Sequence, residues 1–319
     1  MEIIYGVQNY RASERLVLAL GNFDGLHIAH RKIIGRTKTR AEETGLKSAV
    51  FLLDPHPASV LQPQKKFLLL SSLQERAEIL ENMGINYMLV EAFTKEMAAL
   101  SPFQFVQHYL VDNLRVQEVI VGFDYTFGNQ GKGTTYHLVQ WGELFNFRVE
   151  IIPPVLLDNE IVSSSLIRQL ILNGEVKKAA DYLGNPFKRR GKVVHGDGRG
   201  KKLGFPTANL TVSEELLLPK KGVYLSLVTW KNQKIFGLTN IGQKPTFGLN
   251  DKISVEIFLL DFCEDIYTEE LTANFLCRIR DEIVFKDAGY LKKQIEADVR
   301  LARKLIAEEY GGLLEKQLI

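Results

Sequence analysis

The chain has 319 residues, of which 45% are hydrophobic and 24% charged, and its formal net charge is +2. This length is enough for two hydrophobic cores, whereas the near-neutral charge indicates no general attraction to nucleic acid or to a membrane surface. Only two cysteines, no apolar span of membrane length and no charged-then-apolar leader predict a cytoplasmic protein without structural disulfides.

Short apolar runs alternate with amphipathic segments in the first half of the chain. The runs are typical of buried parallel strands and lie at Leu16–Leu20, Ala49–Leu53, Tyr87–Val90, Val119–Val121 and Val149–Ile152. Between them, Ser72–Glu75 and Ser101–Gln104 have the composition of capping boxes, which predict helix starts. This alternation predicts a doubly wound α/β sheet, whose ligand crevice lies at the carboxyl ends of the strands.

The segment Gly21–His30 follows the first of these strands and contains His27 and His30. A helix that starts here would offer unpaired backbone N–H groups and its positive dipole end to an anion. The imidazoles would then stabilise charge on a phosphate under attack. The alternative is a pair of unrelated histidines on a surface helix, but Asn-Phe-Asp-Gly directly after a buried strand favours the phosphate site.

The second half of the chain has a different composition. A helical linker at Glu175–Leu183, closed by Gly-Asn-Pro, marks the boundary, so we expect domains at 1–184 and 185–319. Apolar runs separated by Gly, Pro and Asn then predict a small antiparallel β-barrel, with strands at Val223–Trp230, Ile235–Leu238, Ile253–Leu260 and Leu271–Ile279.

Two further segments of the second half have simple expected roles. A long helix is predicted over Tyr290–Tyr310, ended by Gly311-Gly312. Its apolar stripe is expected to pack on the barrel and consists of Leu291, Ile295, Val299, Ala302 and Ile306. The basic run Lys188–Arg190 is short, so we expect a solvated loop face and not a nucleic-acid patch.

The histidine segment resembles the Gly-x-Phe-Asp-Gly-x-His-x-Gly-His signature of the nucleotidylyltransferase superfamily. The chain as a whole resembles the bacterial bifunctional riboflavin kinase/FAD synthetases, and the resemblance covers nearly all 319 residues. It implies that the first domain transfers AMP from ATP to FMN and that the second phosphorylates riboflavin. Ala29 replaces a glycine that lets the adenine ring lie against the backbone, so ATP geometry there is open.

The resemblance implies site residues for the first domain. His27 and His30 would contact the reacting phosphate, and the ATP-binding residues would be Phe23, Asp24, Gly25, Ser164, Ser165 and Arg168. The flavin-binding residues would be His56, in a family-like Asp-Pro-His-Pro, together with Asp124, Tyr125 and Phe127. Considered without the resemblance, His56 is a turn histidine, the aromatic residues belong to the core and the serines cap a helix. Ser165 replaces the usual threonine.

A glycine-dense segment, 196–209, is the second strong signal. It is not a Walker A loop, because its lysines lack the required spacing and no Ser or Thr follows them. It resembles the riboflavin kinase loop that ends in Gly-Phe-Pro-Thr-Ala-Asn, which implies ATP/Mg²⁺-binding residues at Gly196, Lys202, Gly204, Pro206, Thr207 and Asn209. Thr207 and Asn209 would be oxygen ligands of Mg²⁺. Without the resemblance, this is a flexible loop before a strand.

The kinase reaction requires a group that accepts the proton of the attacking hydroxyl. Glu256 is the candidate, because its strand resembles the one that carries the family's catalytic glutamate, although Phe258 replaces a common histidine. Alternation alone would make Glu256 an outward-facing strand residue. Arg280, in a family-like Arg-Asp-Glu segment, is expected to contact the flavin.

Other functions are compatible with parts of this pattern. The barrel could be a regulatory flavin sensor beside a nucleotidylyltransferase with another phosphorylated acceptor. A flavin storage protein with decayed sites is supported only by Ala29. A class I aminoacyl-tRNA synthetase would need a Lys-Met-Ser-Lys-Ser run, which the sequence lacks. We therefore expect riboflavin, FMN and ATP as substrates, with Mg²⁺, and a monomer or weak oligomer.

Overall fold

The computed structural model describes residues 1–11, 14–196, 200, 203–244 and 252–315. Its contacts divide the chain into two compact units, Met1–Ser164 and Ser165–Ile319, and each is described by itself. Among the described residues, no helix has the length and apolar character needed to cross a membrane.

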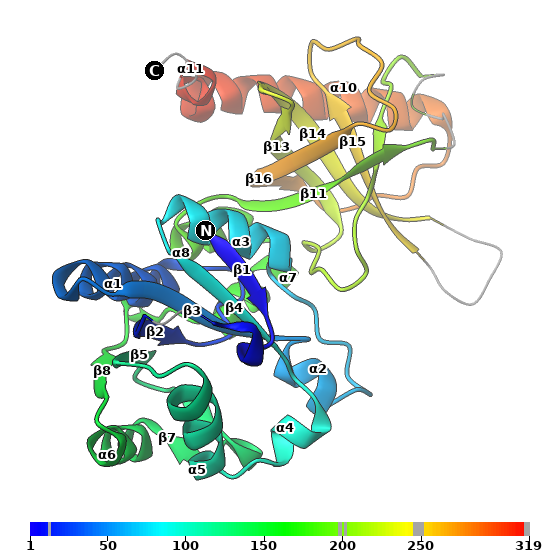
Figure 1. The fold of residues 1–319 in the computed structure, drawn as a ribbon. Coiled ribbons are helices and arrows are strands. Elements are labelled where there is room, and N and C mark those ends of the chain that lie inside the picture. Colours follow the sequence, from blue (N-terminus) through cyan, green and yellow to red (C-terminus); the bar gives the residue numbers. More distant parts are fainter. Residues whose placement is uncertain (12–13, 197–199, 201–202, 245–251, 316–319) are drawn as a thin grey trace. The chain divides into compact units, whose positions relative to one another are not determined.

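The first unit is built on a six-stranded parallel sheet in the order β1-β4-β3-β2-β5-β8 (Figure 1). The strands are β1 (Glu2–Tyr5), β2 (Leu16–Leu20), β3 (Lys47–Asp54), β4 (Tyr87–Ala92), β5 (Glu118–Gly122) and β8 (Arg148–Ile152). The five predicted strands are confirmed. The sixth, β1, was not predicted, because it is a short edge strand with mostly exposed residues.

Strand order places the crevice of this sheet. The chain adds β3 and β4 on one side of β2 and then crosses to add β5 and β8 on the other. Connections after β2 and β5 therefore diverge, and sheets of this topology bind ligands at such a point, outside the carboxyl ends of the two strands. The segments Gly21–His30 and 122–128 follow β2 and β5, so both predicted segments adjoin this switch point.

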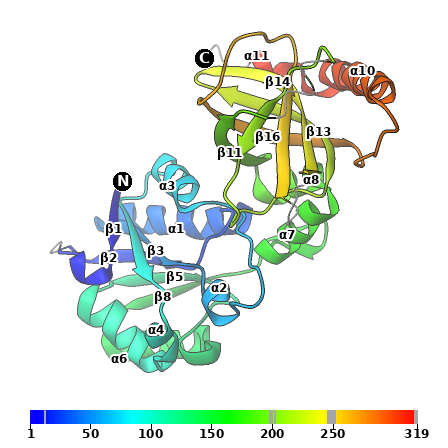
Figure 2. The same cartoon turned by 90° about the vertical axis from the view of Figure 1, so that its right-hand side faces the viewer.

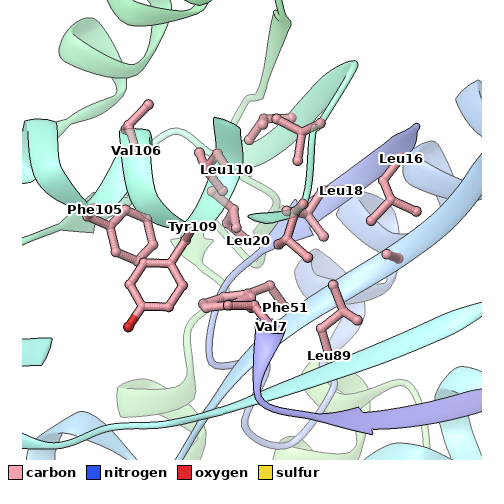
Figure 3. Packing of buried hydrophobic residues seen from close by; sticks show 14 of the residues in the cluster. Val7, Leu16, Leu18, Leu20, Phe51, Leu89, Phe105, Val106, Tyr109 and Leu110 are labelled. Carbon is pink, nitrogen blue, oxygen red and sulfur yellow. The ribbon is translucent and has the colours of Figure 1, made fainter. Parts of the chain in front are cut away.

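Helices cover both faces of the sheet (Figure 1). Residues alternate along β2, so that Leu16, Leu18 and Leu20 face one core and Val17 and Ala19 the other. The first core, drawn in Figure 3, includes residues of α5 (Pro102–Phe105), a π-helix (Val106–Asn113) and α6 (Thr135–Phe145). The second core includes residues of α1 (Ile28–Thr44) and α3 (Leu73–Asn82).

The predicted capping boxes are confirmed at the starts of α3 and α5, where Ser72 pairs with Glu75 and Ser101 with Gln104. The unit also contains the short elements α2 (Pro57–Leu61), α4 (Lys95–Ala99), β6 (Thr126–Phe127), β7 (Gly133–Thr134), β9 (Leu156–Leu157) and β10 (Glu160–Ile161), with 3-10 turns at Val7–Asn9 and Asn129–Gly131.

The second unit is a closed antiparallel barrel, as the sequence predicted (Figure 2). Its strand order is β11-β12-β15-β14-β13-β16, and the four predicted runs correspond to β13–β16, whereas β11 and β12 were not predicted. Its strands are β11 (Phe187–Val194), β12 (Ala208–Thr211), β13 (Gly222–Trp230), β14 (Gln233–Lys244), β15 (Lys252–Leu259) and β16 (Glu270–Arg280). The two helices before the barrel are α7 (Ser164–Asn173) and α8 (Val176–Leu183).

Helix α8 packs against β11 and β16, so it belongs to the barrel unit by its contacts. Its buried residues are Val176, Ala179, Tyr182 and Leu183. The expected boundary after residue 184 therefore lies inside the second compact unit. As a boundary between independently folding domains, it stays a prediction.

The basic run Lys188–Arg190 is not the solvated loop that the sequence suggested. It lies within β11, where Arg189 is only 1% exposed. The Arg189 Nε donates a hydrogen bond to the Leu217 carbonyl, and its guanidinium lies 4.0 Å from the centre of the Phe187 ring. That expectation was wrong because alternation along the strand turns Arg189 to the buried side with Phe187.

The C-terminal helix consists of α10 (Ala288–Leu305), a π-turn (Ile306–Tyr310) and α11 (Gly312–Glu315). The later members of the predicted stripe, Val299, Ala302 and Ile306, pack in the apolar cluster of the barrel. The earlier members, Leu291 and Ile295, line a cavity instead. The expected stop at Gly311-Gly312 was wrong, because Gly311 keeps right-handed helical angles and α11 follows directly.

Candidate functional site

The turn between β2 and α1 has an unusual backbone. Phe23 and Leu26 have positive φ angles of 48° and 42°, in the left-handed region that side chains disfavour. Each such residue costs about 1–3 kcal/mol and persists only where its surroundings fix it. Both side chains are almost fully buried. Packing of these two residues therefore fixes the path of the chain into α1.

The structure brings the two predicted histidines together at the N-terminus of α1. His27 is the N-cap, and its Nδ1 accepts a hydrogen bond from the His30 backbone N–H at 3.3 Å. The two rings stack with their centroids 3.5 Å apart, and the Phe23 ring meets His30 edge-on at 5.2 Å. This arrangement places two imidazoles at a helix end whose dipole favours an anion.

Asp24 is turned into the protein. Its side chain is 2% exposed, and the carboxylate accepts hydrogen bonds from the backbone N–H groups of Leu70 and Ser71 at 3.0 Å. Ser164 Oγ donates to the Asp24 carbonyl at 3.0 Å. These bonds anchor the turn, and the predicted contact of Asp24 with ATP stays a prediction.

The predicted flavin residues differ in accessibility. His56 caps α2, where its Nδ1 accepts the Ala58 N–H at 3.1 Å and its ring stacks on Phe67 at 4.3 Å. Phe127 is 6% exposed and belongs to the core, in agreement with the alternative that the sequence offered without the family resemblance. Tyr125 stacks on Phe127 at 5.7 Å, and burial raises the pKa of its hydroxyl.

Asp124 is exposed, and Phe123 beside it is 41% exposed. Together with Thr126, these two side chains are the exposed members of the segment after β5. Ser165 and Arg168 belong to the second compact unit, on α7, with Ser165 exposed. Their predicted contacts with ATP stay predictions.

The second unit contains a cavity of about 470 Å³ between barrel strands and α10. It holds four of the predicted kinase residues, Thr207, Asn209, Glu256 and Arg280. Its apolar lining comes from Leu203, Phe205, Val223, Leu238, Phe258, Ile283, Phe285, Leu291 and Ile295. Polar and charged side chains make up the rest of the lining, and a cavity that combines apolar walls with convergent polar groups is typical of a small-molecule site.

Strand register explains how Glu256 comes to lie in this cavity. On β15, Ser254, Glu256 and Phe258 line the cavity, whereas Val255 and Ile257 are buried on the other face. Glu256 is paired in register with Asn209 on β12 and with Asn240 on β14. Its carboxylate therefore belongs to a row of polar side chains that crosses three strands.

The glycine-dense segment approaches the same residues. A Cβ added to Gly196 would lie 2.1 Å from Asn209 Nδ2, so glycine is needed for this close approach. Gly200 lines the cavity near Thr207. Gly204 and Pro206 are exposed, and neither lines the cavity. Lys202 lies outside the described residues.

Arg280 is held by a buried carboxylate on α10. Its Nε lies 3.0 and 2.9 Å from the two Asp298 oxygens, and its Nη2 lies 2.8 Å from Oδ2. Gln294 donates to Asp298 Oδ1 at 2.8 Å, and Asp298 is 4% exposed. The bonds fix the guanidinium at the cavity wall, and its predicted contact with flavin stays a prediction.

Sequence reasoning did not single out Asp298, and it connected Asn240 with the site only through a family-like segment, Asn240–Gly242, that was expected to shape a loop over it. In the structure this segment lies within β14. Alternation along a strand predicts that Asn240 lies on the same face of β14 as Leu238, and both line the cavity. This pattern could have identified Asn240 once the strand was assigned. Asp298 had a weaker signal, because its partner Arg280 lies 18 residues earlier and the pair forms only in the folded unit.

Comparisons with known proteins match both halves of the chain. A family model described as FAD synthetase matches residues 9–166, and one described as riboflavin kinase matches residues 183–306. A bifunctional riboflavin kinase/FMN adenylyltransferase of Listeria monocytogenes is 37% identical over 92% of this chain and 93% of its own. The protein of that name from Escherichia coli K12 is 32% identical over 98% and 99%.

A solved structure titled macrolide-efflux protein from Streptococcus pneumoniae also matches, with a TM-score of 0.86 and 32% identity. The match covers 94% of this chain and 98% of that chain. It therefore supports the architecture of each unit described above.

Proposed function

The chain belongs to the bifunctional riboflavin kinase/FMN adenylyltransferase family and makes FMN and FAD, and we propose how its residues divide this work. The observation that carries the proposal is that Thr207, Asn209 and Glu256 line one cavity of the riboflavin kinase segment. Two stacked histidines occupy a helix N-terminus in the FAD synthetase segment. Each segment thus has its own candidate centre.

In the adenylyl step, a phosphate oxygen of FMN attacks the α-phosphorus of ATP in line. The new P–O bond gives FAD, and the bond to the β-phosphate breaks to release pyrophosphate, with no covalent enzyme intermediate. His27 and His30 stabilise the charge on the phosphate oxygens, because they lie at the positive end of α1. The accessible Asp124 and Phe123 contact the flavin.

In the kinase step, a riboflavin hydroxyl attacks the γ-phosphorus of ATP, and ADP leaves. Glu256 accepts the hydroxyl proton as the new P–O bond forms. Asn209 and Asn240, its register partners on both sides, orient the polar end of the site. The apolar lining of the cavity suits the flavin ring, with Arg280 at the wall.

Mg²⁺ fits the donors that this cavity offers. Among the described residues, no group of three or more His, Cys, Asp and Glu side chains converges on a metal site. The Thr207 hydroxyl and the Asn209 carboxamide are hard oxygen donors in the same cavity, and Mg²⁺ is held by few protein oxygens together with substrate phosphates. Thr207 and Asn209 would hold the ion, which would supply positive charge to neutralise the phosphates of ATP.

Retention of an intact polar row around Glu256 favours an active kinase over a flavin sensor or a decayed storage protein. Both family models and the curated relatives concern flavin nucleotide synthesis, so we do not propose macrolide efflux. The test is incubation with riboflavin and Mg-ATP, followed by chromatographic separation of flavins. FMN appearing first and FAD later supports the proposal, and unchanged riboflavin would overturn it.

A further inference from the structure

A buried polar cluster contacts the turn 22–25, which precedes the two histidines. The cluster belongs to the segment 70–76, which ends in the first turn of α3. Ser71 is 6% exposed and Arg76 is 1% exposed. Polar and charged groups buried to this degree destabilise a fold unless they are hydrogen-bonded. The partners of these two side chains therefore indicate what they do.

Ser71 connects two consecutive residues of the strained turn. Its Oγ accepts the Gly25 backbone N–H at 2.8 Å and donates to Asp24 Oδ1 at 3.3 Å. The Asp24 carboxylate also accepts the backbone N–H groups of Leu70 and Ser71. One hydroxyl and one carboxylate thus hold the turn to a segment 46 residues away.

Arg76 holds the start of the same turn. Its Nη1 donates to the Asn22 carbonyl at 3.0 Å. Burial lowers the pKa of this guanidinium, and the charges of Asp24, Asp54 and Glu75 oppose that shift. Burying a cation this deeply costs folding free energy. Its hydrogen bond to the Asn22 carbonyl can offset that cost by fixing a strained backbone conformation.

We propose that Ser71 and Arg76 are positioning residues for adenylyl transfer, which hold the turn 22–25 so that His27 stacks on His30. The turn stores strain at Phe23 and Leu26, so it relaxes when its external bonds are removed. A small misplacement of a catalytic group can lower the rate of the chemical step by a large factor. This inference rests on the proposed role of the two histidines.

The first test is Ser71→Ala, with Thr94→Ala as the matched control. Thr94 Oγ1 also accepts a backbone N–H, from Met97 at 3.2 Å, but it caps α4. In Ser71→Ala, kcat for FMN adenylylation is expected to fall about 10- to 100-fold with the ATP KM within about twofold. The kinase activity of the same molecules stays unchanged, and Ser71→Thr, which restores the hydroxyl, recovers most of the loss.

Hydrogen exchange gives a second readout. Peptides covering Gly21–His30 are expected to exchange faster in Ser71→Ala and in Arg76→Met, but not in Thr94→Ala. Ser71→Cys fills the site with a slightly larger thiol that is a weaker hydrogen-bonding group, so it provides the same test if the alanine variant does not fold.

Several results would overturn the inference. These are a wild-type adenylylation kcat in Ser71→Ala, a parallel loss of both activities in the folded cysteine variant, or no recovery in Ser71→Thr. His30→Ala distinguishes the proposed role of the histidines from the positioning role of Ser71 and Arg76. If His30→Ala retains adenylylation, the proposed role of the histidines fails. If His30→Ala loses adenylylation while Ser71→Ala does not, only the positioning inference fails.

Discussion

The pair Arg280–Asp298 should contribute strongly to the stability of the barrel unit, and Asp298→Ala tests this. The side chains are 17% and 5% exposed, and the carboxylate is met by Nε, Nη2 and the Gln294 amide within 3.0 Å. Removing one partner of a buried pair leaves an unpaired charge, which typically costs about 3–5 kcal/mol. We therefore expect this loss in the free energy of unfolding of the barrel unit.

The chain offers a matched control on the same helix. Arg303 and Asp261 form an ion pair at 2.6 Å, but the two side chains are 58% and 74% exposed. An exposed pair of this kind contributes about 0–1 kcal/mol, because water and salt screen it. Arg303→Ala should therefore change the stability far less than Asp298→Ala. Arg303 is the partner to replace, because Asp261 has a positive φ of 55°, where alanine would add backbone strain of its own.

The assay is urea unfolding followed by tryptophan fluorescence. Trp230 lies in the barrel unit and Trp141 in the sheet unit, so a Trp141→Phe background restricts the signal to the barrel. The refuting result is a loss below about 1 kcal/mol in Asp298→Ala, equal to that of the Arg303→Ala control. It would mean that the buried geometry of the pair contributes no more than an exposed one.

Four further predictions concern the two activities and the boundary. Glu256→Gln keeps the volume of the side chain but removes the base, so FMN formation from riboflavin should fall about 10²–10⁴-fold. FAD should still form from supplied FMN. Undiminished FMN formation would mean that Glu256 has only a structural role in its strand. His30→Ala should lower FAD formation from FMN by about a hundredfold or more and spare the kinase step, as chromatography of the flavins from each substrate will show. Gly196→Ala should displace the Asn209 carboxamide, because the added Cβ would lie 2.1 Å from its nitrogen. The kcat of the kinase step should therefore fall while adenylylation persists. Wild-type kinase kinetics in this variant would contradict the prediction. Separately expressed pieces 1–164 and 165–319 should be more stable than pieces cut after residue 184, because α8 packs on β11 and β16. Thermal unfolding of the four pieces compares the two boundaries.

The sequence predicted the elements whose signals are local. Apolar runs of strand length marked five strands of the sheet, and the pairs Ser72–Glu75 and Ser101–Gln104 marked two helix starts correctly. The sequence failed where an interaction is formed only by the folded barrel. Arg189 has the composition of a solvated run, yet Phe187 and the Leu217 carbonyl bury it.

The same distinction holds for the candidate sites. A motif names the side chains next to it in sequence, such as His27 and His30, but not the groups that hold them. Ser71 and Arg76 lie more than 40 residues from the turn that they bond, and nothing in their local pattern indicates that contact. Motif residues can also have a structural role that the motif does not indicate, since the Asp24 carboxylate accepts hydrogen bonds from backbone N–H groups.

Glu256 shows how two interpretations of one residue can hold together in the folded barrel. Alternation correctly predicts that Glu256 points away from the face that holds Val255 and Ile257. In an isolated strand, that direction would be solvent. Here α10 covers this face of the barrel, so an outward-facing residue lies inside a cavity of about 470 Å³ between strand and helix. The outward-facing and the catalytic interpretations of Glu256 are therefore compatible, because the helix converts the outer face of the barrel into the wall of a site.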